Sequence, residues 1–167
     1  IVSWSNNPTG NFPAEPTSAQ LSVNFASLNQ YKAASDTITY RSAKFVRLFG
    51  ASASKDMQAL FRIVKLNNQF SDNELKSRVL TAIKQYFDPN NWQFGETFFF
   101  TELSTFIHQQ LGSAIGSIVI LPRNTSGVFG ELFEVKAMPN ELFISTATVN
   151  DIEIINQIDS QTLRADR

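Results

Sequence analysis

The sequence predicts an α+β fold in which antiparallel or mixed sheet segments carry two main helices packed on one face. Two observations lead to this prediction. β-branched and aromatic residues mark strands in the early and late parts of the chain, and two amphipathic helical patterns lie between them. A length of 167 residues, with 43% apolar and 17% charged residues, suits one folded domain and not a disordered chain.

The N-terminal segment 1–20 differs from the rest in composition. It holds three of the six prolines together with Gly10 and several Asn and Ser residues, so it predicts an extended, Pro-rich arm or linker. We assign 21–158 to a single α+β domain and 159–167 to a C-terminal tail. Because the chain starts without Met or a signal peptide, we expect it to be a fragment of a longer protein.

Strands are expected before the first helix. The segment 21–28 alternates apolar and polar residues, and 37–49 is rich in β-branched and aromatic residues, so both predict strands. The segment 57–70 fits either a helix or a buried strand. We favour a strand that ends near Leu66.

The first predicted helix begins at Ser71, which forms a capping-box pattern with Glu74. Glu74 also has the spacing to pair with Arg78 one turn on, and Asp88-Pro89 ends the helix. One apolar stripe, which must be buried, consists of Leu75, Val79, Leu80, Ile83, Tyr86 and Phe87.

The second predicted helix follows "TFFF", a short buried strand or entry turn, with Thr101 as its N-cap and Gly112 as its terminating residue. Its apolar stripe comprises Leu103, Phe106, Ile107 and Leu111. The pattern then becomes β. Strands are predicted at 118–121, 132–137 and 142–145, with a tight turn at Pro139-Asn140, and finally within 151–158.

The residue types exclude several kinds of active site. With no cysteine there is no disulfide, thiolate zinc site or cysteine nucleophile, and with His108 as the one histidine there is no multi-histidine metal site. His108 lies about 120° from the centre of its helix's apolar stripe, so we expect it to be peripheral. We therefore predict no catalytic, cofactor-binding or metal-binding residue.

Short motifs that match enzyme signatures have simpler explanations. "SASK" at Ser52–Lys55 and "SDN" at Ser71–Asn73 match two motifs of penicillin-recognising enzymes, but they lie too close together and no K-T-G follows. The segment 50–55 lacks the second glycine of a phosphate-binding loop. The sequon at 124–126 is most simply a loop.

Carboxylates on the C-terminal strands suggest an alternative function, a hydrolase or ligand-binding domain. Their alternation with apolar residues instead favours the solvent face of a half-exposed sheet. The residues concerned are Glu131, Glu134, Glu141, Asp151 and Glu153.

Charge is unevenly distributed along the chain. Residues 1–88 hold ten Lys/Arg against six Asp/Glu, whereas 89–167 hold four against nine. The two halves could attract each other within one molecule or between neighbours. The net charge of −1 argues against nucleic acid, although basic Arg41, Lys44 and Arg47 alternate with apolar residues. The longest apolar runs are too short for a membrane span, so we expect no membrane partner.

Three segments in order carry a family resemblance: the two helical patterns at 71–112, "IGSIVILP" at 115–122 and the closing strands at 140–155. Together they resemble the baseplate J-like proteins of contractile-tailed phages, over about 61–155. The resemblance implies a structural wedge protein of the virion, assembled in the host cytoplasm, without catalytic residues or cofactors. It implies association with itself, as a homodimer or ring around the tail hub, and with other baseplate wedge proteins.

The aromatic run "NWQFGETFFF" at 91–100 allows two interpretations. Continuous apolar residues favour burial, with Phe98 and Phe100 on one side of a strand and Phe99 on the other. Aromatics are also enriched in interface cores, so a partner interface is the functional interpretation. Its candidate residues are Trp92, Phe94, Phe99 and Phe129. A third interpretation is a sugar- or surface-binding tail module, for which Trp4 or Trp92 beside a groove would be the sign.

Overall fold

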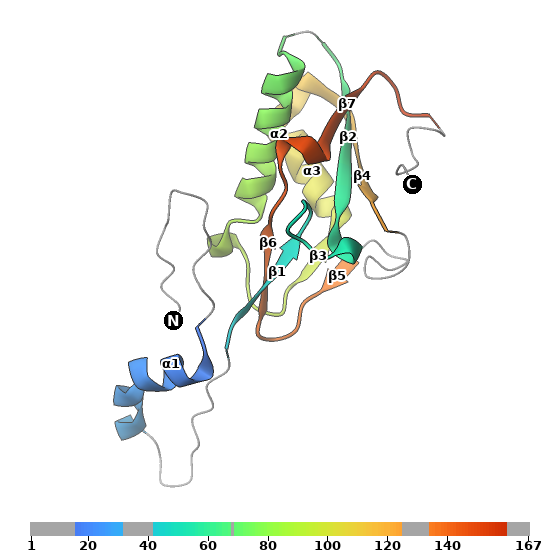
Figure 1. Ribbon diagram of the computed structural model, residues 1–167. Coiled ribbons are helices and arrows are strands. Elements are labelled where there is room, and N and C mark those ends of the chain that lie inside the picture. The colour runs from blue at the N-terminus through green and yellow to red at the C-terminus, as the bar shows by residue number, and fades with distance from the viewer. Residues whose placement is uncertain (1–15, 32–41, 68, 125–133, 160–167) are drawn as a thin grey trace. The chain divides into compact units, whose positions relative to one another are not determined.

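A computed structural model describes residues 16–31, 42–67, 69–124 and 134–159 of the chain (Figure 1). The chain divides into two compact units, Ile1–Phe45 and Val46–Arg167. This division falls within the range 21–158 that the sequence predicts as one domain. The limits predicted for the arm and the tail stay predictions, whereas the α+β class is confirmed by the helices and sheets described below.

The first unit contains α1 (Ser18–Asn24) followed by a 3₁₀ helix (Ala26–Tyr31), neither with a buried residue. The strand predicted at 21–28 is therefore wrong. A complete capping box explains the helix: the Thr17 hydroxyl accepts from the Gln20 backbone N–H at 3.2 Å, and the Gln20 side-chain oxygen accepts from the Thr17 N–H at 2.9 Å. Local capping outweighs the alternation of the apolar residues.

The second unit is built on a mixed three-stranded sheet of order β4-β2-β7. The central strand β2 (Ala59–Lys65) pairs antiparallel with β4 (Ile115–Pro122) and parallel with β7 (Ile152–Ile155). The prediction of a strand, and not a helix, that ends near Leu66 is thus confirmed. The strand predicted at 118–121 is confirmed as part of β4. The closing strand is shorter than its predicted segment.

Two helices cover one face of this sheet, as predicted. α2 (Asp72–Tyr86) contacts α3 (Phe100–Leu111), and they contact β7 and β4 respectively (Figure 1). The Ser71 cap is confirmed, with its hydroxyl 3.3 Å from the Glu74 N–H. Glu74 does not complete the capping box. Its carboxylate instead binds Arg78 at 3.0 Å, which is the predicted pair.

The start of α3 differs from the prediction. The helix begins at Phe100, and the N-cap position is Phe99, which makes no side-chain capping bond, so the assignment of Thr101 as N-cap is wrong. Phe99 still belongs to β3 (Thr97–Phe99), while Phe100 is buried. The strand therefore runs directly into the helix without a polar cap. Gly112 ends α3 with a φ of 50°, as predicted.

Two small sheets complete the unit. β3 pairs antiparallel with β5 (Glu134–Lys136), and β1 (Lys44–Leu48) pairs with β6 (Glu141–Ser145). The predicted turn at Pro139-Asn140 is present, but the strands on either side of it pair with other partners. Residues 132 and 133 of the predicted strand lie outside the described residues. Short 3₁₀ turns lie at Lys55–Met57, Pro89–Asn91, Gly112–Ala114 and Val149–Asp151.

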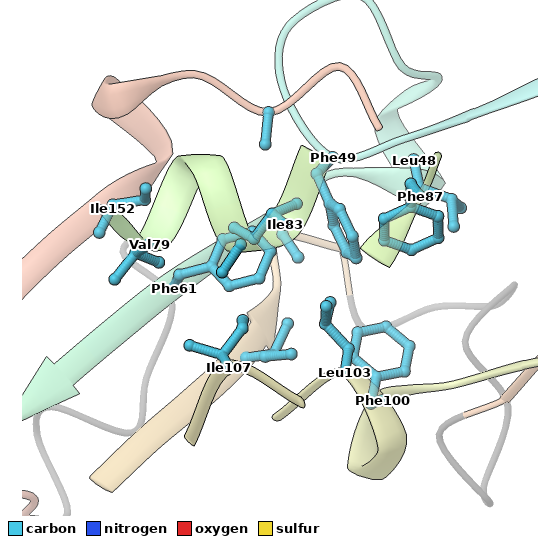
Figure 2. Packing of buried hydrophobic residues seen from close by; sticks show 14 of the residues in the cluster. Leu48, Phe49, Phe61, Val79, Ile83, Phe87, Phe100, Leu103, Ile107 and Ile152 are labelled. Carbon is cyan, nitrogen blue, oxygen red and sulfur yellow. The ribbon is translucent and has the colours of Figure 1, made fainter. Parts of the chain in front are cut away.

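Phe49 lies at the centre of the core, between the sheet and the helices (Figure 2). It is fully buried and has a φ of 63°, an uncommon backbone conformation for a residue with a side chain. Its ring lies among four other phenylalanines at centroid distances of 4.9 to 6.2 Å, all edge to face. These are Phe61, Phe87, Phe98 and Phe100.

Candidate partner interface

The candidate interface residues predicted from sequence occupy different environments. Phe94 is 40% exposed, whereas Trp92 and Phe99 are partly buried. Phe129 lies outside the described residues. The structure also exposes Met138, at 64%, which the sequence analysis did not select.

Phe94 stands on a tight turn formed by residues 93–96. The Glu96 N–H donates to the Gln93 carbonyl at 3.3 Å, and the Glu96 carboxylate accepts from the Gln93 N–H at 2.8 Å. Gly95, with a φ of 78°, occupies the third position, where a left-handed conformation is required. The turn is therefore closed by both the backbone and a side chain.

Met138 stands on a second turn of the same construction, formed by residues 138–141. The Glu141 N–H donates to the Met138 carbonyl at 2.9 Å, and the Glu141 carboxylate accepts from the Met138 N–H, also at 2.9 Å. Pro139 fixes the backbone at the second position of this turn. In each turn a glutamate thus holds an apolar residue in place.

A backbone hydrogen bond joins the two turns. The Gly95 N–H donates to the Glu141 carbonyl at 3.1 Å. A Cβ added to Gly95 would lie 3.3 Å from the Pro139 Cα, tighter than most real contacts, so glycine permits this close approach. We call residues 93–96 and 138–141 the paired turns. They present two exposed apolar side chains from adjacent, hydrogen-bonded backbone.

The paired turns rest on a packed aromatic layer. The ring of Trp92 stacks on Phe87 with an interplanar angle of 8° at 5.5 Å and meets Phe143 edge to face at 5.6 Å. Its indole N–H donates to the Tyr86 carbonyl at 2.8 Å, so the polar atom of the ring is satisfied. Trp92 therefore supports the neighbouring turn and serves the core more than the surface.

The three consecutive phenylalanines divide between core and surface. Phe98 is fully buried and Phe100 nearly so, whereas Phe99 is partly exposed on the opposite face of β3. Phe99 pairs in register with Glu134, and Glu134 binds Lys136 at 3.1 Å. Phe99 thus lies on a polar sheet face, and no ring contact within the described residues connects it to Phe94.

The C-terminal carboxylates lie in separate interactions. Glu134 binds Lys136, Glu141 closes a turn, and Glu153 binds Arg62 at 2.8 Å. Glu131 lies outside the described residues. Among the residues described, no three His, Asp, Glu or Cys side chains gather as a metal site would require.

The prediction that Asp151 is a solvent-facing carboxylate is wrong, because this residue is only 6% exposed. It accepts hydrogen bonds from the Thr148 N–H at 2.9 Å and the Thr148 hydroxyl at 2.8 Å, and it pairs with Arg123 at 3.3 Å. These three donors compensate for its burial. Asp151 therefore fixes the turn that leads into β7.

The residues of the enzyme-like motifs cap a helix, form a surface ion pair or permit close packing of the backbone. Ser71 caps α2, and Asp72 beside it binds Lys65 at 2.9 Å. Gly50 has a φ of 65°, and a Cβ there would lie 2.0 Å from the Thr146 carbonyl oxygen, so it permits close chain packing. His108 is peripheral, as predicted, with Nε2 3.4 Å from the Gly116 carbonyl oxygen.

One pocket was not predicted from sequence. It has a volume of about 330 Å³ and lies between α2 and α3, lined by Tyr86, Thr101, Glu102, Thr105, Phe106 and Gln109. The helical periodicity placed Tyr86 and Phe106 in apolar stripes but could not show that the two rings meet beside polar residues of α3. Burial, reinforced by the Glu102 carboxylate and then by Glu96, raises the pKa of the Tyr86 hydroxyl, so this group ionises less readily than an ordinary tyrosine.

Comparison of the sequence with protein-family models and with curated proteins finds no match. In the described part of the chain, none of the helices has both the length and the apolar character that crossing a bilayer requires.

Proposed function

We propose that the chain is a structural component of a phage tail baseplate wedge and mediates subunit contacts in the ring around the tail hub. The proposal takes its phage context from the resemblance of residues 61–155 to baseplate J-like proteins, and in particular to the C-terminal part of the large wedge protein of T-even-like phages. The protein would act in the virion after assembly in the host cytoplasm, through interfaces and without chemistry.

The observation that carries the assembly role is the exposure of Phe94 and Met138 on the paired turns. Exposed apolar side chains on a flexible loop would lose conformational entropy when a partner binds. Here the turns are closed by Glu96 and Glu141, so much of that cost is already met in the free protein. Aromatic and methionine side chains are enriched in the cores of protein interfaces.

The first unit supplies a second apolar surface. α1 and its 3₁₀ extension bury no residue, and Val23, Leu28 and Tyr31 are exposed. Helices in folded proteins gain most of their stability from packing an apolar face, and a seven-residue helix is too short to be stable alone. A neighbouring subunit would provide such packing.

The uneven charge supports contact between sister copies. The chain has an excess of basic residues in 1–88 and of acidic residues in 89–167. In a ring, the basic part of one copy can meet the acidic part of the next, which favours a repeated head-to-tail contact.

Co-purification with the other wedge proteins of a contractile-tailed phage tests the proposal. We expect a stable complex that survives size-exclusion chromatography and that weakens when Phe94 and Met138 are both changed to Ser. A chain that sediments as a strict monomer over a wide concentration range, and that also binds no wedge protein, would contradict it.

A further inference from the structure

The pocket between α2 and α3 combines aromatic walls with acceptor groups. The rings of Tyr86 and Phe106 lie 5.4 Å apart, centroid to centroid, and both are partly buried. Glu102 stands at the pocket with its carboxylate 3.4 Å from the Tyr86 hydroxyl, which donates to it. The Gln109 side chain contributes a further possible acceptor.

The charge at this pocket has one sign. Glu102 forms no ion pair within the part of the chain that the structure describes, and the pocket lining includes no basic side chain there. Glu96 does not line the pocket, but its charge acts on the Tyr86 hydroxyl in the same direction as that of Glu102. A carboxylate beside aromatic rings attracts a cation.

We propose that this pocket binds an arginine side chain presented by a protein partner, an inference that rests on the assembly role proposed above. A guanidinium group is planar and has five N–H donors, so it can lie against the aromatic walls while it donates to Glu102 and Gln109. The pocket is open to solvent on one side, and its volume of about 330 Å³ leaves room for one long side chain.

Tyr86 connects the pocket with the segment that carries Phe94. The Tyr86 carbonyl accepts a hydrogen bond from the Trp92 indole N–H. Glu96, four residues further on, closes the turn that presents Phe94. We expect a partner that covers the paired turns to reach the pocket with a long side chain. An apolar anchor next to a charge-selective pocket gives specificity beyond the area that is buried.

A titration with N-acetyl-arginine amide, followed by nuclear magnetic resonance of the intact chain, tests the pocket without requiring any assembly. We expect saturable shifts at the Gln109 side-chain amide and the backbone of 101–106, with a dissociation constant in the millimolar range. The neutral isostere N-acetyl-citrulline amide should bind at least about fivefold more weakly, since it cannot make charge-assisted hydrogen bonds.

Two variants of equal charge complete the test. Glu102→Gln should weaken arginine binding by about fivefold or more, whereas Glu74→Gln, which removes an exposed carboxylate elsewhere on the helices, should leave it unchanged. Equal binding of arginine and citrulline, tighter binding of a lysine probe, or unchanged binding by Glu102→Gln would overturn the proposal. If the probe binds but the chain forms no complex with wedge proteins, the assembly role fails and the pocket stands.

Discussion

The Gly95 backbone N–H donates to the Glu141 carbonyl oxygen at 3.1 Å, although 46 positions separate the two residues along the chain. This bond holds the turn that carries Phe94 against the turn that carries Met138. Each turn is also closed by its own glutamate carboxylate. The exposed apolar pair therefore stands on backbone with few remaining degrees of freedom, which is the property that an interface anchor requires.

Substitution by alanine should destabilise the protein to different extents at three glycines. Gly112→Ala introduces only backbone strain, about 1–3 kcal/mol, because φ 50° with ψ −123° is a conformation that side-chain-bearing residues rarely adopt, while nothing lies within 4 Å of the new Cβ. Gly95→Ala adds a tight contact with the Pro139 Cα, and Gly50→Ala places a Cβ against the Thr146 carbonyl. The loss in the free energy of unfolding should be largest for Gly50→Ala, as measured by urea denaturation, because its Cβ would meet a backbone carbonyl at 2.0 Å. A loss for Gly50→Ala no larger than that for Gly112→Ala would contradict the close chain packing at Gly50.

Truncation of a buried and of an exposed phenylalanine should change the free energy of unfolding by very different amounts. Phe49→Ala removes a ring that contacts four others in the core, so we expect a loss of about 3–5 kcal/mol in the free energy of unfolding. Phe94→Ala truncates an exposed side chain and should cost less than about 0.5 kcal/mol. Thermal and urea unfolding of both variants measure this difference. A large loss for Phe94→Ala would place that residue in the core.

Tyr86 should make stability depend on alkaline pH. Burial first, and Glu102 and Glu96 next, raise its pKa in the folded state above the ordinary value of 10.0. The stabilisation is complete below the unfolded pKa, and it is lost as the pH rises from about 10 through the folded pKa, because the unfolded state ionises first. The difference in unfolding free energy between the native chain and Tyr86→Phe should therefore shift in favour of the variant above about pH 10. An absence of any such shift would contradict the raised pKa.

Asp151 should contribute more to the free energy of unfolding than an exposed carboxylate does. Asp151→Ala leaves the Thr148 N–H and hydroxyl without their acceptor, so we expect a loss of about 2–3 kcal/mol. Glu74→Ala breaks an exposed pair with Arg78 and should cost only about 0.3–0.5 kcal/mol. Urea denaturation compares the two variants. Similar small losses would restore the interpretation of Asp151 as a solvated surface carboxylate.

Features set by neighbouring residues could be predicted from the sequence. The Ser71 cap, the Glu74–Arg78 pair and the glycine that ends α3 each depend on a few consecutive positions, and all three were predicted. The strand β2 was also favoured correctly, since its apolar run is short and rich in residues that suit strands.

Features that depend on distant partners could not be predicted in this way. The parallel pairing of β2 with β7 joins segments about 90 residues apart, and no local pattern specifies it. The helix α3 begins at Phe100 and has no polar N-cap residue, because the Phe100 ring packs in the core beside Phe49. Met138 belongs to the candidate interface only because Gly95 brings its turn to Phe94.

Sedimentation velocity of the native chain and of the Phe94→Ser/Met138→Ser double variant, over a concentration series, tests the central claim most directly. The control is Leu66→Ser/Val149→Ser, since Leu66 and Val149 are 61% and 41% exposed and so match Met138 and Phe94 at 64% and 40%. We predict that the native chain and the control associate as concentration rises, while the paired-turn variant stays monomeric with an unchanged free energy of unfolding. Association that persists in the paired-turn variant, or that the control abolishes equally, would contradict the account.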